Sequence, residues 1–286
     1  MFIPDFFIIG APKCGTTSLD KFLTGHPDVR MASFKEPHFF SQDIGWQVVK
    51  SREKYESLFD ITAEKTSGRI YGESSVFYLY SDQAISTIES CRSDVKYIIL
   101  LRNPIDMLLS LHAENRKSGD EVHRSFESAW RNIGRSKRRI RNPVAMNYKL
   151  VGRLGFRIEK LLDIVPRERV LFIELSEFVN NWGYVMGAIT SFLEIPPSSQ
   201  VIMPFENMRR EYRSITLNRL IASISDIVGP KSRHREILKK IGGVIRKLNM
   251  SSQETLGITP LFRRELEMFF ADDTQLLRSL TGKRLV

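Results

Sequence analysis

The chain has 286 residues, and its 43 Lys and Arg against 33 Asp and Glu give a formal net charge of +10 at pH 7. This excess favours anionic partners, but it does not choose among nucleotides, acidic glycans, nucleic acids and membrane surfaces. A content of 42% hydrophobic and 27% charged residues is typical of a globular protein and excludes a disordered chain. With only two cysteines, Cys14 and Cys91, a disulfide scaffold is excluded as well.

The first predicted element is a strand, loop and helix over residues 5–23. Four large apolar residues, 6–9, precede a turn that contains Gly10, Pro12 and Gly15, and apolar residues at helical spacing follow. In such a loop, successive backbone N–H groups and the positive end of the helix dipole point at one place. The stretch therefore predicts an anion site.

Lys13 adds a full positive charge to this loop. Hydroxyl donors follow at Thr16, Thr17 and Ser18. The loop differs from the Walker A loop of nucleoside triphosphatases, which, aligned on Gly10 and Gly15, would need lysine at position 16. A lysine placed earlier can lie over the bridging oxygen of a 5′-phosphate group instead.

The segment from Pro12 to Ser18 closely resembles the 5′-phosphosulfate loop of sulfotransferases that use 3′-phosphoadenosine 5′-phosphosulfate (PAPS). The resemblance implies one α/β domain over residues 1–286, with a P-loop-like parallel sheet flanked by helices. It implies that the cofactor is held by Lys13, Cys14, Gly15, Thr16, Thr17 and Ser18. Lys13 would stabilise the negative charge that grows on the departing phosphate oxygen. The alternative is a glycine turn that merely joins strand to helix.

A short segment with charged residues between aromatic ones follows at residues 34–40, where Pro37 biases Glu36 away from helix. In the family branch that resembles heparan sulfate sulfotransferases, a glutamate in such a segment deprotonates the acceptor. The resemblance therefore implies Glu36 as the general base, and we expect its partly buried carboxyl to have a raised pKa. His38 is the rival base, because the cytosolic branch of the family uses histidine. A surface turn without catalytic function is the structural alternative.

Residues 46–59 are expected to form a helix that ends near Phe59. Residues 70–79 are predicted to begin as a strand and to turn at the serines into a helix. The family has a similar segment that lines the acceptor site, so the resemblance makes Glu73 and Ser74 candidate substrate contacts. Ser74 stands where some glycan-modifying members carry lysine.

A buried parallel strand is predicted from Val95 to Arg102, and Asn103 and Pro104 are the expected N-cap and first residue of the next helix. Arg102 and Ser110 are eight residues apart, so both can face the space beyond the carboxyl end of the strand, where open α/β sheets bind ligands. In the family, the matching arginine and serine hold the 3′-phosphate of the cofactor. An ion pair at a strand end and a helix-packing serine are the alternatives.

Six basic residues lie between positions 131 and 141. No aromatic residues are interleaved with them and no nucleic-acid-binding motif accompanies them, so nucleic-acid binding is not predicted. A solvated surface is the first interpretation of this cluster. The second is a rim that attracts an anionic acceptor.

The later chain is predicted to be scaffold: a helix over 148–164, a buried strand over 170–173, helix up to Pro196, and helices after residue 215, the last opened by Thr259 and Pro260. The polar, basic stretch 204–214 resembles a late loop that folds over the adenine and 3′-phosphate in relatives. Arg210 and Arg213 are therefore candidate cofactor contacts, and a solvated loop is the alternative.

The resemblance implies an enzyme that transfers the sulfuryl group of PAPS to a hydroxyl or amine of an acceptor and releases adenosine 3′,5′-bisphosphate. Carbohydrates and natural products, including anionic ones, are candidate acceptors. The scheme requires no metal, and no cluster of metal-ligand residues is evident. Two other classes stay open: a P-loop kinase acting on a small molecule, and a non-catalytic protein that binds an anion or glycan.

The sequence also carries an expectation about location. No apolar run approaches the roughly 18 residues of a membrane span, and no basic and apolar targeting pattern precedes Phe6. We therefore expect a cytoplasmic protein with no membrane span.

Overall fold

The computed structural model describes residues 1–59, 68–135, 142–198, 211–212, 250–251 and 257–285. At the centre of this part of the chain lies a five-stranded parallel sheet with the strand order β2-β3-β1-β4-β5. Its strands are β1 (Phe6–Gly10), β2 (Val29–Met31), β3 (Ile70–Ser74), β4 (Lys96–Leu101) and β5 (Val170–Glu174). The predicted α/β fold with a parallel sheet is confirmed.

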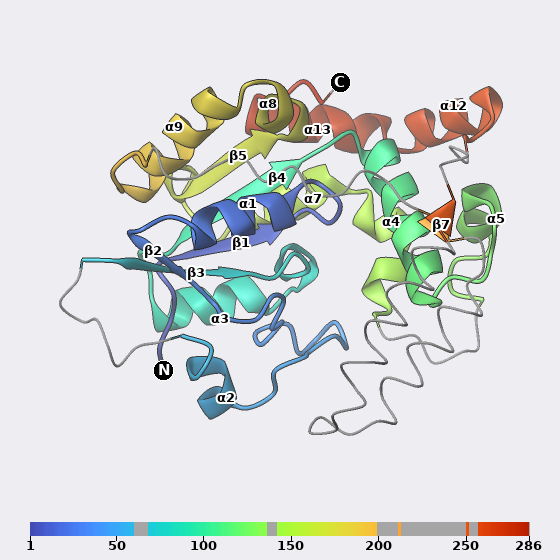
Figure 1. Cartoon of the computed structure of the whole chain (residues 1–286). Helices are drawn as coiled ribbons and strands as arrows, with labels where there is room; N and C mark the ends of the chain where they lie inside the picture. Colours follow the sequence, from blue (N-terminus) through green and yellow to red (C-terminus); the bar gives the residue numbers. More distant parts are fainter. Residues whose placement is uncertain (60–67, 136–141, 199–210, 213–249, 252–256, 286) are drawn as a thin grey trace.

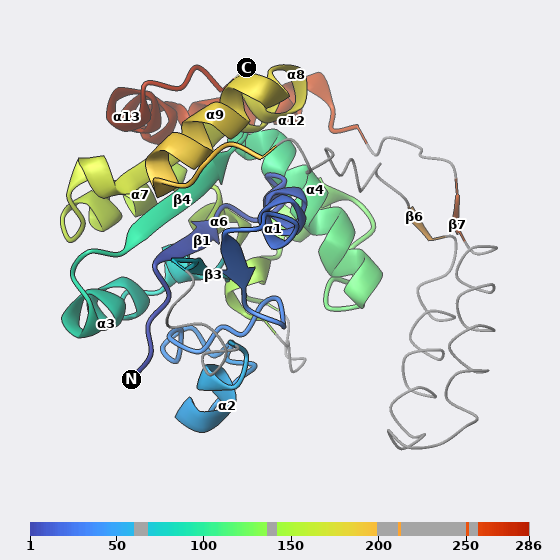
Figure 2. The same cartoon turned by 60° about the vertical axis from the view of Figure 1, so that its left-hand side comes forward.

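Helices cover both faces of the sheet, which is why β1 and β4 are continuous apolar runs rather than alternating ones. One face carries α1 (Thr16–Thr24), α8 (Leu175–Asn180) and α9 (Trp182–Leu193), and the other carries α3 (Ala84–Cys91) and α7 (Leu154–Leu162) (Figures 1 and 2). The rings of Phe22 and Trp182, 5.0 Å apart, join α1 to α9.

The other described elements surround this core. They are α2 (Arg52–Glu56), α4 (Pro104–Ser118), α5 (Phe126–Arg131), α6 (Tyr148–Val151), α12 (Pro260–Phe269), α13 (Ala271–Thr281), and the short 3₁₀ turns η1 (Tyr78–Tyr80), η2 (Val144–Met146) and η3 (Arg167–Arg169). A two-stranded antiparallel sheet joins β6 (Glu211–Tyr212) to β7 (Met250–Ser251), seen beyond α4 in Figure 2. Asp273 of α13 accepts hydrogen bonds from the backbone N–H groups of Gly155 and Phe156, which fixes α13 on α7.

The predicted helix starts are confirmed. The Asn103 side chain accepts a hydrogen bond from the N–H of Ile105 at 3.0 Å, with Pro104 in the first position of α4. The Thr259 hydroxyl accepts from the N–H of Phe262 at 3.2 Å and begins α12 in the same way.

Two predicted helices differ in the structure. Of residues 46–59 only Arg52–Glu56 are helical, because the N–H groups of Val48 and Val49 donate to the carbonyl oxygen of Pro37 and hold this part in a loop. The helix predicted over 148–164 is divided into α6 and α7 at Gly152, where a Cβ atom would lie 2.4 Å from the Phe270 ring. The helices predicted between residues 215 and 248 lie outside the described residues.

None of the helices in the described ranges is both long and apolar enough to cross a membrane.

Gly72 is a position where the sheet admits no side chain. A Cβ atom there would lie 2.2 Å from Cζ of Phe6 and 2.6 Å from Sδ of Met31. We expect Gly72→Ala to lower the free energy of unfolding by about 1–3 kcal/mol, since overpacking forces the neighbours to move. Urea denaturation measures this.

Gly187 provides the matched control for that substitution. It lies exposed within α9, and a Cβ atom added there would meet nothing within 4 Å. There Gly→Ala is expected to raise stability by roughly 0.5–1 kcal/mol, because alanine has the better helix propensity. Equal effects at both positions would contradict the packing argument.

Candidate active site

The loop between β1 and α1 lies at the carboxyl edge of the sheet. The N–H of Ala11 donates to the carbonyl oxygen of Leu100, 2.8 Å away, and ties the loop to β4. Gly15 has a φ of 93°, and a Cβ there would lie 3.0 Å from Cδ1 of Leu175, so only glycine fits this N-cap position. No described side chain caps α1. Its positive end is therefore not neutralised by a side chain of the helix itself.

The side chain of Cys14 packs inside this loop. Its thiol is fully buried and donates to the carbonyl oxygen of Pro12 at 3.4 Å. Burial raises the pKa of the thiol to about 12, against the opposing positive charges of Arg102 and Lys13. The thiol is thus an inert packing group, and the charges of Arg102 and Lys13 both lie close to the loop.

Lys13 connects the loop to α4. Its ammonium lies 3.5 Å from Oε2 of Glu114, and both side chains are partly exposed. Ser110 precedes Glu114 by four residues, so the two lie on the same face of the helix. The structure therefore turns the Ser110 face of α4 toward the loop, next to the end of β4 where Arg102 follows.

The segment with the predicted base lies beside the end of β3. The N–H of His38 donates to Oγ of Ser75 at 3.0 Å, and the N–H of Ser75 donates to the carbonyl oxygen of Ile8 in β1. The ring Nε2 of His38 lies 2.8 Å from Oε2 of Glu36. The imidazole is buried, while a quarter of the Glu36 side chain (26%) is exposed. Of the two rival bases, Glu36 is the one that solvent reaches.

The expected raised pKa of Glu36 is wrong. Burial alone would raise the pKa of this carboxyl, but the hydrogen bond from His38, the charge of Lys35 and the N–H of Val76 together lower it below its ordinary value. Glu36 is therefore ionised at neutral pH, which is the form that a general base requires.

Glu73 is not exposed to an acceptor. Its carboxylate is fully buried and accepts hydrogen bonds from the hydroxyls of Tyr55 at 2.8 Å and Tyr78 at 3.0 Å. Burial raises its pKa to about 7, against hydrogen bonds that lower it, and the charge of Glu36 raises it further. The predicted substrate contact by this side chain is thus corrected to a structural role: it ties β3 to α2.

Sequence reasoning missed Lys35 and Glu114. The Lys35 ammonium donates to Oγ of Ser74 and lies 3.6 Å from Oε1 of Glu36. In the sequence, the one signal for Lys35 was its position next to Glu36. For Glu114, the spacing of one helical turn from Ser110 was the signal.

Arg210 and Arg213 lie outside the described residues. Among the residues that are described, no group of three or more His, Cys, Asp and Glu side chains is placed to hold a metal ion.

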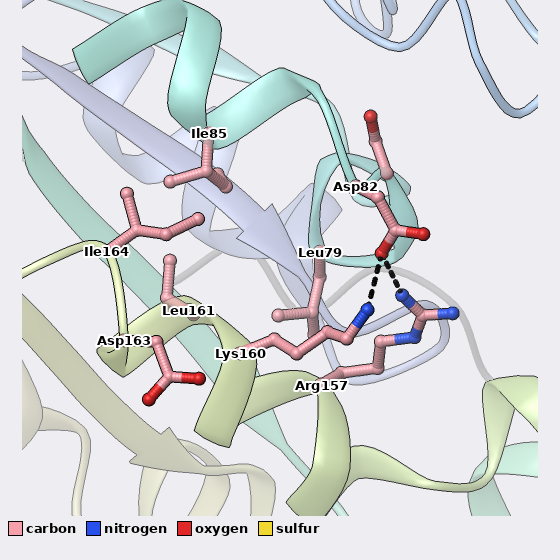
Figure 3. A pocket seen from close by; sticks show the side chains of 9 residues that line it. Leu79, Asp82, Ile85, Arg157, Lys160, Leu161, Asp163 and Ile164 are labelled. Carbon is pink, nitrogen blue, oxygen red and sulfur yellow. Dashed lines mark hydrogen bonds and ion pairs between the residues drawn. The ribbon is translucent and has the colours of Figure 1, made fainter. Parts of the chain in front are cut away.

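A pocket of about 250 Å³ lies between η1, α3 and α7 (Figure 3). Asp82 accepts there from Arg157 at 3.0 Å and Lys160 at 3.1 Å, above apolar side chains that include Leu79. Leu79 also packs against Gly10, where a Cβ atom would lie 2.8 Å from its Cδ2. The pocket therefore lies behind the loop and shares none of its predicted site residues.

Comparison with known proteins decides the family. The family model described as the sulfotransferase domain matches residues 3–229. The chain belongs to the sulfotransferase family. PAPS is the sulfuryl donor of this family, which agrees with a loop whose nearby charged side chains include the cations Lys13 and Arg102.

The chain resembles carbohydrate sulfotransferase 15 of Rattus norvegicus, with 27% identity and 69% of this chain covered. It also resembles heparan sulfate glucosamine 3-O-sulfotransferase 3B1 of Homo sapiens, with 26% identity and 67% covered. The matches cover 45% and 46% of those proteins, so the chain spans about half the length of the curated relatives it matches.

Two solved sulfotransferase structures share the fold of this chain. A sulfotransferase from Alicyclobacillus acidocaldarius superimposes with a TM-score of 0.72 at 25% identity, covering 100% of this chain and 98% of the other. Mouse sulfotransferase SULT7A1, solved in complex with PAP, gives 0.50 at 13% identity, with 95% and 84% covered, and shows the shared fold.

The raised pKa of Glu73 predicts a pH-dependent stability. Between its ordinary pKa of 4.5 and the folded value of about 7, the folded state binds the proton and the unfolded chain does not. Raising the pH through this window therefore lowers the free energy of unfolding, by up to about 3 kcal/mol. Glu73→Gln cannot ionise, so its stability relative to wild type should be greater at pH 8 than at pH 5. Urea denaturation at both pH values measures this, and parallel pH profiles would contradict it.

The Lys13–Glu114 pair predicts a gain in affinity. In Glu114→Gln a carboxylate next to the predicted anion site is lost, so adenosine 3′,5′-bisphosphate should bind about two- to five-fold more tightly, the range of a partly exposed ion pair. Calorimetry measures the affinity. Glu159→Gln on the exposed face of α7 is the control and should change nothing. Unchanged affinity in Glu114→Gln would mean that Glu114 does not compete with the nucleotide for Lys13.

Proposed function

We propose that this protein transfers the sulfuryl group of PAPS to a hydroxyl of an acceptor. One observation carries the proposal: the carboxyl ends of three neighbouring parallel strands bring together the Lys13 loop after β1, the Glu36 segment beside β3, and Arg102 after β4. The candidate anion site, the candidate base and a second cation thus share one edge of the sheet.

The residues at this edge fit an anionic nucleotide. The loop offers the positive end of α1 and the Lys13 ammonium for the 5′-phosphosulfate, and Arg102 with Ser110 is our assignment for the 3′-phosphate. PAPS, when bound, supplies the sulfuryl group together with a phosphate leaving group.

The chain's own residues act on charge and on the proton. Lys13 offsets the negative charge that develops on the leaving oxygen, because its ammonium is already placed at the loop. Glu36 accepts the proton of the acceptor hydroxyl. His38 donates to Oε2 and orients the carboxylate, so its assigned role is positioning.

Three points support a carbohydrate as the acceptor. The relatives named above carry carbohydrate and heparan sulfate in their names. The proposed base is a glutamate, as in the glycan-modifying branch that the sequence resembles. The net charge of +10 favours anionic partners in general, and an acidic glycan is one of them. An amine acceptor is the alternative, and a cytoplasmic location stays a prediction.

Calorimetry with adenosine 3′,5′-bisphosphate tests the nucleotide site. We expect binding in wild type and a loss of about 10- to 100-fold in Arg102→Ala, the size of a lost set of charge-assisted hydrogen bonds. Arg153→Ala is the matched control, because Arg153 is exposed and lies over the Phe269 ring on α12. Preference for ATP with magnesium would favour a kinase instead, and binding of neither would favour a non-catalytic protein.

Consumption of PAPS, with chondroitin and desulfated heparin as acceptor probes, tests the base. Glu36→Gln should lower the rate by about 10²-fold or more and leave nucleotide binding unchanged. A Glu36→Gln variant with full activity, together with an inactive His38→Gln variant, would transfer the role of base to His38.

A further inference from the structure

Lys35 has no role in the predictions from the sequence or in the proposed mechanism. Its ammonium donates to the Ser74 hydroxyl at the end of β3 and lies 3.6 Å from Oε1 of Glu36. The side chain is 18% exposed, so the charge is held between the strand end and the base and is not free in solvent. A lysine anchored in this way is a fixed charge beside the reacting group.

The two oxygens of the Glu36 carboxylate have different surroundings. Oε2 accepts from Nε2 of His38 at 2.8 Å and from the N–H of Val76 at 3.4 Å. Oε1 faces the Lys35 ammonium at 3.6 Å, which is longer than a hydrogen bond. The charge on Oε1 is thus compensated while its lone pairs stay open to a new donor.

We propose that Lys35 is a positioning residue for the base: anchored on Ser74, its ammonium holds the Oε1 side of Glu36 and leaves that oxygen to take the acceptor proton. This inference rests on the proposed function. The acceptor oxygen forms its bond to sulfur while the bond from sulfur to the phosphate oxygen breaks. The proton passes to Oε1, the leaving phosphate keeps the electron pair, and Lys35 remains an ammonium throughout.

Other charged groups face Glu36 from the elements packed around it. Asp20 on α1 and Glu73 on β3 are carboxyls whose charges are coupled to that of Glu36, and both have a raised pKa, mainly from burial. His38 on the same loop donates to it. Lys35 is a cation whose charge lowers the pKa of both Asp20 and Glu36.

A titration of the Glu36 carboxyl without any nucleotide tests this directly. Protein labelled with ¹³C at the glutamate carboxyl carbons is titrated by NMR, and Glu36→Gln assigns the resonance. In Lys35→Met the midpoint should rise by about one pH unit, because a cation next to the carboxylate is lost. Lys50→Met, at an exposed lysine, is the matched control and should leave the midpoint unchanged.

Ser74→Ala tests the anchor. It should raise the midpoint by less than Lys35→Met does, and the double variant should equal Lys35→Met alone, since the serine acts through the lysine. Additive shifts, or an unmoved midpoint in Lys35→Met, would overturn the positioning role. Calorimetry with adenosine 3′,5′-bisphosphate, expected to be unchanged in all three variants, shows that the site is still folded.

The acid limb of PAPS consumption should move with the NMR midpoint in each variant. A midpoint that shifts while the acid limb stays fixed would mean that Lys35 does not act through the base in the reaction. Wild-type protein that fails to bind the bisphosphate would instead overturn the proposed function, and the role of Lys35 with it. If the wild-type protein is active but the Glu36 titration midpoint of Lys35→Met equals that of wild type, only the Lys35 inference is overturned.

Discussion

The parallel pairing of β1 with β3 on one side and β4 on the other is the constraint on which the candidate site depends. Parallel strands end at one edge, so the segments after β1 and β4 meet the end of β3 there, whatever their separation in sequence. The Glu36 segment, which follows β2 in the chain, packs against that end of β3 through His38 and Ser75. Two backbone hydrogen bonds fix these segments to the sheet: the N–H of Ala11 donates to the carbonyl oxygen of Leu100, and the N–H of Ser75 donates to that of Ile8. A loop, a base and a cation placed on separate surface turns would lack this fixed geometry.

The sequence predicted what local patterns encode. The apolar run of β1, the glycine loop, and the caps at Asn103 and Thr259 depend on neighbouring residues, and these predictions are confirmed. The helix predicted over residues 46–59 was wrong for a physical reason, because backbone bonds from Val48 and Val49 to Pro37 override the helical tendency.

Parts of the site could not be read from the sequence. The contacts of Lys13 with Glu114 and of Lys35 with Ser74 join residues 101 and 39 positions apart. A motif names residue types along the chain, whereas an ion pair depends on which side chains the fold brings within about 4 Å. The pKa of Glu36 shows the consequence: the burial that the sequence suggested is present, but partners from two segments outweigh it.

Glu36 and Glu73 are coupled to each other, but the pKa values of their carboxyl groups are shifted in opposite directions. Glu36 has a cation and an imidazole beside it and some contact with water, so its charged form is stabilised. Glu73 is fully enclosed, has neutral hydroxyls such as those of Tyr55 and Tyr78 as hydrogen-bond partners, and keeps its proton up to about pH 7. The charge of Glu36 raises the pKa of Glu73. An ionised Glu73 would raise the pKa of Glu36 in the same way. A protonated Glu73 therefore helps Glu36 to stay an ionised base, which makes the buried carboxyl part of the electrostatics of the site without any contact with the acceptor.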